Sequence, residues 1–176
     1  MKNIILIAVT GSNGAFKDKG CPLRNINNDY CTFFRNRTEE QNIVISAQTY
    51  GELPDKSPPY SKRDVYIISA TPLKIDEGNT RTFVLSTVQE AMTMAAQSNK
   101  HTYIVADCKL YKDIYNNHRI DEIYHAIINE PYDNDCCWEE PSSLFWQPMP
   151  PIEKKPDQGR RVPGYEIVKY RHNPVM

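Results

Sequence analysis

One acidic side chain in the first third of the sequence has a spacing that suits chemistry. Apolar residues recur around Asp29 at helical spacing: Ile26, Tyr30, Phe33 and Phe34. At about 100° per residue, Asp29 is about 40° from Phe33 around the helix, so its carboxylate borders the apolar stripe. A carboxylate there is unfavourable unless it is paired, caps the helix or serves a function, such as accepting two parallel hydrogen bonds. The free N–H groups of a helix start also stabilise a negative charge, and position alone favours that second interpretation.

Cysteine and histidine spacing predicts neither a disulfide framework nor a metal site. The five cysteines are an odd number without C-x-x-C spacing: Cys21, Cys31, Cys108, Cys136 and Cys137. The adjacent Cys136 and Cys137 do not readily bridge to each other. The four histidines are scattered through the sequence. We therefore expect reduced thiols and no bound metal.

Predicted strands and helices alternate along the first two thirds of the chain. Short β-branched runs predict strands at residues 4–9, 43–45, 65–68, 82–85 and 102–105. Helical spacing predicts helices around residues 26–34, 87–96 and 110–115, the second of them with a capping box from Thr87 to Glu90. This alternation favours an α/β fold with a mostly parallel central sheet flanked by helices.

The last third of the chain has a different pattern. Strands are expected at residues 121–128, 144–146 and 164–170, and a proline-rich connection runs between the last two. We expect an antiparallel C-terminal hairpin whose long loop covers residues 148–164. Residues 1–176 are therefore expected to form a single domain.

Charge and hydropathy exclude several classes of protein. Lys and Arg number 21 against 22 Asp and Glu, so the net charge of −1 does not fit a polybasic nucleic-acid binder. The longest apolar run, residues 4–9, is too short to cross a bilayer, and no signal-peptide cleavage site follows it. We expect a cytoplasmic monomer that binds a small molecule rather than nucleic acid or a membrane.

Several segments, in their order and spacing, resemble the dihydrofolate reductase family. The segments are Asn13–Pro22, Asp29 with Phe33 one turn later, Asn42–Tyr50, Leu53-Pro54, Arg63 before a strand, Val105–Tyr111 and the strand Tyr165–Tyr170. The resemblance covers nearly the whole chain. It implies a dihydrofolate reductase-like fold and NADPH-dependent reduction of 7,8-dihydrofolate to tetrahydrofolate, a step of one-carbon metabolism.

The resemblance assigns a substrate site. Asp29 matches the buried carboxylate that holds the pterin's amino-pyrimidine edge and assists its protonation. Arg63 matches the arginine that grips the substrate's glutamate carboxylate, although a lone arginine is more often a solvated surface residue. The residues expected to contact substrate are Ile7, Ala8, Phe33, Arg63 and Val105; Ile7, Phe33 and Val105 would be core residues in any fold of this type.

The resemblance also assigns a cofactor site for NADPH. The residues expected there are Val9, Thr49, Ser69, Lys109 and Tyr111. Thr49 matches a helix-start threonine between cofactor and substrate, and it equally suits a simple helix cap. Ser69 and Lys109 match contacts to the adenosine 2′-phosphate, and Tyr111 matches a tyrosine beside the nicotinamide.

The cofactor half departs from the family pattern. Ala106 and Asp107 replace a Gly-Gly pair, joined by a cis peptide, that lets backbone N–H groups approach the cofactor phosphates. At about 4 Å and an effective dielectric near 20, the charge of Asp107 would repel a phosphate charge by roughly 4 kcal/mol, about a thousandfold in affinity. Other departures are Lys17 and Ser46 for glycines, Leu23 for a tryptophan, Ala47 for a basic residue, and the loss of a threonine within Asp135–Cys137.

Three hypotheses follow from these matches and departures. The chain is a divergent dihydrofolate reductase, a non-catalytic relative that keeps the fold for binding or assembly, or a reductase of the same superfamily acting on another small heterocycle. Turnover of dihydrofolate and stabilisation by NADPH discriminate among the three.

Overall fold

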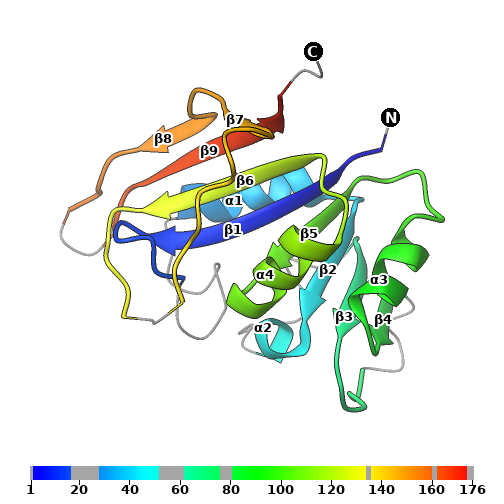
Figure 1. Cartoon of the computed structure of the whole chain (residues 1–176). Coiled ribbons are helices and arrows are strands. Elements are labelled where there is room, and N and C mark those ends of the chain that lie inside the picture. Colours follow the sequence, from blue (N-terminus) through cyan, green and yellow to red (C-terminus); the bar gives the residue numbers. More distant parts are fainter. Residues whose placement is uncertain are drawn as a thin grey trace.

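The strands and helices follow the predicted alternation (Figure 1). The computed structural model describes residues 2–16, 28–51, 62–75, 81–133, 136–159 and 162–173. Its helices are α1 (Asn28–Thr38), α2 (Ala47–Gly51), α3 (Val88–Ala95) and α4 (Cys108–Asn117). Its strands are β1 (Ile4–Gly11), β2 (Asn42–Ser46), β3 (Asp64–Ile68), β4 (Thr82–Leu85), β5 (Thr102–Ala106), β6 (Glu122–Ile128), β7 (Trp146–Pro148), β8 (Glu153–Lys155) and β9 (Tyr165–His172).

One sheet joins all these strands. Its order is β4-β3-β2-β5-β1-β6-β9-β7, and β8 pairs with β9 beside this path. The pairs from β4 to β6 are parallel, whereas β9 is antiparallel to β6, β7 and β8. The predicted mostly parallel sheet with an antiparallel C-terminal part is therefore confirmed. The long apolar run at residues 4–9 forms the interior strand β1 because both of its neighbours, β5 and β6, cover its edges.

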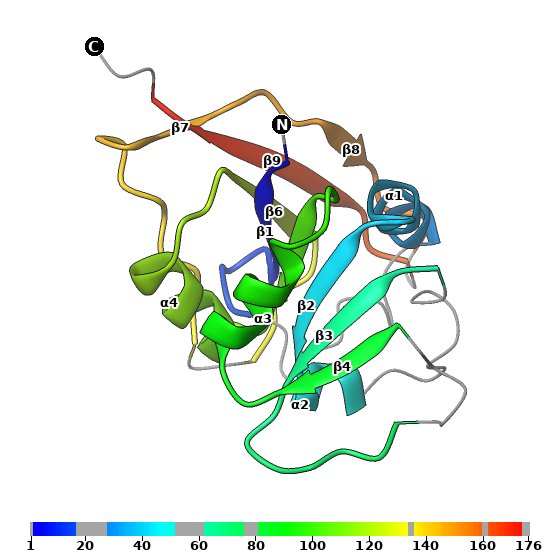
Figure 2. The ribbon, with the colours of Figure 1, turned by 90° about the vertical axis from the view of Figure 1, so that its right-hand side faces the viewer.

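Alternate residues of β1 face two hydrophobic cores, as the period of a strand requires. Ile5, Ile7 and Val9 belong to the core that includes Phe34 of α1. Leu6 and Ala8 belong to the opposite core, which includes the buried faces of α3 and α4. Figure 2 shows α3 and α4 on one side of the sheet and α1 on the other. The expected substrate residues Ile7 and Ala8 thus point to different faces.

Helix α3 begins as its sequence predicts. The Thr87 hydroxyl accepts a hydrogen bond from the Glu90 backbone N–H at 3.2 Å. The Glu90 carboxylate accepts in return from the backbone N–H groups of Ser86 and Thr87. The predicted capping box is therefore confirmed.

The prediction that residues 148–164 form one long loop is partly wrong. Within residues 148–164, Glu153–Lys155 form β8, which pairs antiparallel with residues 165–167 of β9. The proline-rich sequence conceals this strand because short edge strands tolerate flanking prolines. The hairpin itself is confirmed, since β7 pairs antiparallel with β9. None of the described helices has the length and apolar character needed to span a membrane.

Candidate functional site

The carboxyl ends of the parallel strands gather the groups that could bind a ligand. α2 begins directly after β2, and α4 begins one residue after β5. β2 and β5 are neighbours in the sheet, so the starts of the two helices meet at one edge. Open α/β sheets bind ligands at this edge. The site is therefore built from Ser46 and Thr49 on one side and from Asp107 and the first turn of α4 on the other.

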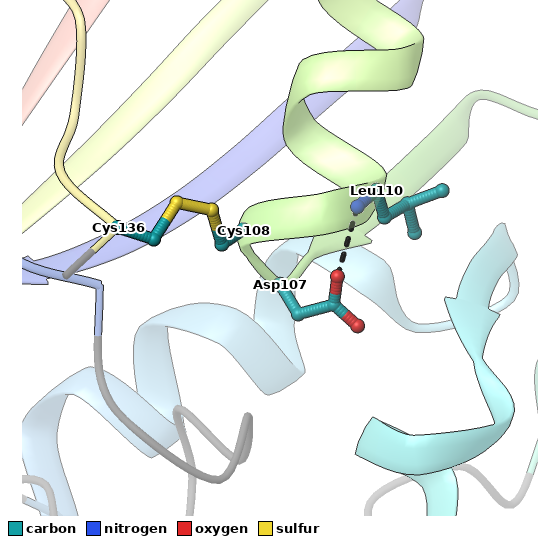
Figure 3. The surroundings of a disulfide bond; sticks show 4 residues. All are labelled: Asp107, Cys108, Leu110 and Cys136. Carbon is teal, nitrogen blue, oxygen red and sulfur yellow. Dashed lines mark hydrogen bonds between the residues drawn. A yellow bond between two sulfur atoms is a disulfide. The ribbon is translucent and has the colours of Figure 1, made fainter. Parts of the chain in front are cut away.

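Asp107 closes the start of α4. Its Oδ1 accepts a hydrogen bond from the Leu110 backbone N–H at 2.9 Å, which makes it the N-cap (Figure 3). Its Oδ2 lies 2.5 Å from the Ser46 hydroxyl and 3.3 Å from the Thr49 hydroxyl, and both hydroxyls donate to it. The sequence predicted that the Asp107 charge would face a ligand. Instead, both oxygens of its carboxylate accept hydrogen bonds from groups within the protein.

Ser46 and Thr49 form the other side of this edge. The Ser46 hydroxyl accepts from the Thr49 backbone N–H at 3.1 Å, so it caps α2 in the way that Asp107 caps α4. Thr49 is fully buried. The interpretation of Thr49 as the cap of α2 is wrong, because its neighbour Ser46 makes that bond. Ser46, where the resemblance implies a glycine, connects the two helix starts through its hydroxyl.

A disulfide lies beside this edge, which corrects the expectation of reduced thiols. Cys108, the first residue of α4, is bonded to Cys136, with a Cα–Cα distance of 6.3 Å (Figure 3). Cys137 is free and exposed. An odd cysteine count does not exclude one pair, and only the tertiary structure brings these two positions together across 28 residues.

The segment Cys136–Trp138 is held against the loop that follows β1. The Phe16 N–H donates to the Cys136 carbonyl at 2.9 Å, and the Trp138 N–H donates to the Gly14 carbonyl at 2.8 Å. Residues 15 and 137 form an antiparallel bridge. The disulfide therefore links the start of α4, through Cys136, to residues 14–16. The expected departures at Lys17, Leu23 and Asp135 lie outside the described residues.

His125 is a buried residue that the sequence did not single out. Its ring stacks on Trp138 with centroids 3.9 Å apart, and its Nε2 lies 2.7 Å from the Thr10 hydroxyl. Burial lowers the pKa of His125 to about 3. Nδ1 of His125 and Nε1 of Trp138 have no hydrogen-bond partner. A lone histidine in a strand carries no local signal, so only packing reveals this group.

Tyr111 lies in the same aromatic cluster. Its ring contacts Phe16 and Trp138, with centroid distances of 5.4 and 4.9 Å. Its hydroxyl donates to the Glu139 carbonyl at 2.9 Å. Burial raises the pKa of Tyr111 above its ordinary value. The residue matched to the nicotinamide contact is thus packed within the protein and keeps its proton.

Asp29 is not the buried carboxylate that the sequence predicts. Its side chain is 45% exposed, and Oδ2 lies 3.9 Å from the Lys155 ammonium and 3.5 Å from the Gln158 amide nitrogen, which donates to it. Among the α1 side chains that the structure describes, Phe34 and Thr38, four residues apart, are buried. Asp29 is five residues before Phe34, so its side chain points about 140° away from that of Phe34 around the helix.

Asp29 instead opens on a cavity between α1 and β8. The cavity has a volume of about 310 Å³ and is lined by Asp29, Thr32, Phe33, Asn36, Arg37, Glu153 and Lys155. Phe33 is half-buried, and the Arg37 guanidinium lies 5.3 Å from its ring centroid. The cavity therefore offers an aromatic face with charges of both signs around it.

Arg63 is buried, so its interpretation as a solvated surface arginine is wrong. Its side chain is 3% exposed. Nε donates to the Thr38 hydroxyl at 2.8 Å, and one terminal nitrogen donates to the Arg35 carbonyl at 2.7 Å. These bonds hold the guanidinium against the last turn of α1, where the helix dipole favours a cation.

The remaining expected site residues are placed in three ways. Ile7 and Val105 are register partners on β1 and β5, and both are buried in the core that includes Phe34. Ser69 closes a turn after β3, where its hydroxyl contacts Thr71. Lys109 is exposed in the first turn of α4. Of these four residues, the structure therefore brings Ile7 and Val105 together.

No cluster of three or more possible metal ligands occurs among the described residues. The candidate site is therefore described by hydroxyls, carboxylates, aromatic rings and guanidinium groups.

The sequence and the fold match one known family. A sequence model of the family described as dihydrofolate reductase matches residues 3–171. The solved structure of dihydrofolate reductase from Enterococcus faecalis, complexed with NADP(H) and RAB-propyl, superposes with a TM-score of 0.74. That protein is 18% identical, and the likeness covers 98% of this chain and 97% of that one. No curated protein matches the sequence. The likeness confirms the fold expected from the sequence.

Proposed function

Because the chain belongs to the dihydrofolate reductase family, we propose that it reduces 7,8-dihydrofolate to tetrahydrofolate, with NADPH as the hydride donor. The observation that carries this proposal is the family match over residues 3–171. The strand-end site described above supports it, since α/β sheets of this kind hold ligands there. The product would supply one-carbon metabolism.

The residues expected to contact substrate support this function because several of them are held in place by the fold. Ile7 and Val105, register partners on the adjacent strands β1 and β5, are buried apolar side chains in the core that includes Phe34. Arg63 is fixed by two hydrogen bonds to the end of α1, and a fixed guanidinium fork suits a carboxylate such as the glutamate tail of folate. These residues would orient a flat heterocycle and its tail rather than carry out bond making.

Asp29 is the carboxylate that we propose for the heterocycle's N–H pair. Asp29 lines the cavity beside Phe33, and its Oδ2 lies 3.9 Å from the Lys155 ammonium. A flat ring that entered this cavity would exclude water from the carboxylate and strengthen its hydrogen bonds. The role assigned to Asp29 is to hold the ring in one tautomer and to stabilise a proton on it.

The cofactor side does not fit NADPH in the arrangement that the structure describes. When bound, a nicotinamide supplies a hydride, and the family holds its phosphates at the start of the helix after the central strand. In this chain the Asp107 carboxylate accepts the hydrogen bonds of Leu110 N–H and the Ser46 hydroxyl. A pyrophosphate at that place meets a negative charge and donors that are already used, so this carboxylate must first be displaced.

The occupied helix start favours a second candidate function. A relative that has lost the reaction but keeps the fold for binding or assembly would not need an open phosphate site. The donors that the Asp107 carboxylate binds all belong to the protein, which is the property expected of such a relative. NADPH would then neither stabilise the protein nor be oxidised by it.

Oxidation of NADPH by dihydrofolate tests the proposed function directly. We expect turnover in the wild type and a fall of about 100-fold or more in Asp29→Asn, because the amide cannot accept two parallel hydrogen bonds as a carboxylate does. Asp113→Asn is the matched control, since Asp113 is exposed on α4 and contacts Asn117. Absence of turnover in the wild type with both ligands in excess would reject the reductase function. Equal turnover in wild type and Asp29→Asn would reject the role of Asp29 alone.

A further inference from the structure

The Asp107 side chain collects the hydrogen-bond donors of the strand-end site. Leu110 N–H donates to Oδ1 at 2.9 Å, and the Ser46 and Thr49 hydroxyls donate to Oδ2 at 2.5 and 3.3 Å. These donors come from two elements, since Leu110 is on α4 while Ser46 and Thr49 are at the start of α2. The carboxylate therefore links two helices that would otherwise present their free donors at this edge.

The same donors are those that an incoming phosphate would need. A helix start carries partial positive charge and unpaired N–H groups, so it attracts anions. Hydroxyls from a neighbouring element add further donors without charge. A carboxylate and a phosphate oxygen both accept from such groups, so the two compete for one set of donors.

The position of the carboxylate is fixed by its neighbours. Cys108 follows Asp107 and is bonded to Cys136 (Figure 3). The Cys136 carbonyl in turn accepts a hydrogen bond from the Phe16 N–H. The disulfide thus ties the start of α4 to the segment 136–138. A ligand cannot gain room by shifting this helix start without disturbing the 136–138 segment and the loop after β1.

We propose that Asp107 is an internal competitor for the phosphate groups of the hydride donor, and that it sets how tightly this protein binds a dinucleotide. The proposal rests on the proposed function for the identity of the donor. An anion binds here only when Asp107 gives up its contacts with Leu110 and Ser46. Removal of the charge opens the site, while removal of a remote charge on the same helix does not.

Two substitutions separate the charge of Asp107 from its capping role. Asp107→Asn keeps an oxygen that can accept from the Leu110 N–H but removes the negative charge. Asp107→Gly removes both the cap and the charge. Asp113→Asn on the exposed side of α4 is the matched control, because it removes one negative charge from the same helix.

Ligand-induced thermal shifts and binding titrations provide the readout without requiring activity. The probes are NADPH and inorganic pyrophosphate, each titrated into full-length oxidised protein. We expect both substitutions at Asp107 to tighten NADPH about 10- to 100-fold, the range expected when a competing charged hydrogen-bond acceptor is removed. Pyrophosphate should stabilise the two Asp107 variants more than the wild type, and Asp113→Asn should behave as the wild type.

Two results would overturn this inference. Wild-type protein that binds NADPH as tightly as Asp107→Asn would show that the carboxylate does not compete. NADPH that binds none of the variants would show that another feature of the site excludes it. Turnover assays distinguish failure of the proposed function, since an Asp107→Asn variant that binds NADPH tightly without reducing dihydrofolate rejects the reductase function and retains the inference.

Discussion

Two aspartates at the starts of two helices have opposite surroundings. Asp29, in the first turn of α1, is 45% exposed and faces a cavity. Asp107, at the start of α4, is surrounded by three donors from within the protein. The α1 region therefore presents a carboxylate that a ligand can reach. In the α2–α4 region, the carboxylate of Asp107 already accepts hydrogen bonds from the protein. An acidic residue at a helix start shows its role only through the groups that face it.

The covalent bond near Asp107 gives the largest expected difference between the two regions. The chain-entropy model assigns about 3–4 kcal/mol to a disulfide that closes a loop of 28 residues. Cys108→Ser should therefore lower the free energy of unfolding in urea by that amount, and reduction of the wild type should do the same. Cys137→Ser, which changes the adjacent free thiol, should leave the midpoint within error. If the wild type, Cys108→Ser and Cys137→Ser had the same free energy of unfolding, the result would contradict the bond between Cys108 and Cys136.

Acid should weaken the α4 side of the sheet through His125. Its pKa is about 3 in the folded protein and about 6.5 in an unfolded chain. Between these two pH values the unfolded chain therefore binds a proton that the folded protein does not bind. The contribution to stability is complete above pH 6.5 and decreases as the pH falls towards 3, by about 3 kcal/mol at pH 4. His125→Gln should reduce this slope in urea titrations at several pH values, whereas His118→Gln should preserve it. A slope unchanged by His125→Gln would place the proton uptake elsewhere.

A smaller effect is expected at Arg63, on the α1 side. Arg63→Lys keeps the positive charge but loses the guanidinium fork, so the KM for dihydrofolate should rise about tenfold while kcat changes little. Arg119→Lys is the control, because Arg119 is exposed and paired with Asp121. A fall in kcat with an unchanged KM would instead assign Arg63 a structural role at the end of α1.

Local patterns predicted the fold, but the contacts of the site depend on tertiary packing. The run at 4–9 and the Thr87–Glu90 box are short-range signals, and both were confirmed. The prediction that Asp29 is buried was wrong because the buried face of α1 is set by its packing on the sheet. Of the side chains described in this helix, Phe34 and Thr38 are the buried ones. A sequence pattern defines the spacing of a helix stripe to within about one residue, which is enough to turn a side chain by 100°.

The contacts of Asp107 and Cys108 were inaccessible for a different reason. The resemblance implies that an aspartate stands at position 107 in place of a glycine, and the expected repulsion of a phosphate follows from its charge. The sequence does not show that Ser46, 61 residues earlier, lies within hydrogen-bond distance. The pairing of Cys108 with Cys136 likewise depends on how the 136–138 segment packs on the loop after β1. Both features need the sheet order before they can be inferred.

The neighbouring thiol of Cys137 matters for how samples of this protein behave. Cys137 is free and directly follows Cys136, so thiol–disulfide exchange would transfer the bond with Cys108 from Cys136 to Cys137. The exchanged form has the same mass as the original, and intact mass spectrometry does not distinguish them. Peptide mapping under acidic quench does, and it defines which molecule a binding titration has measured.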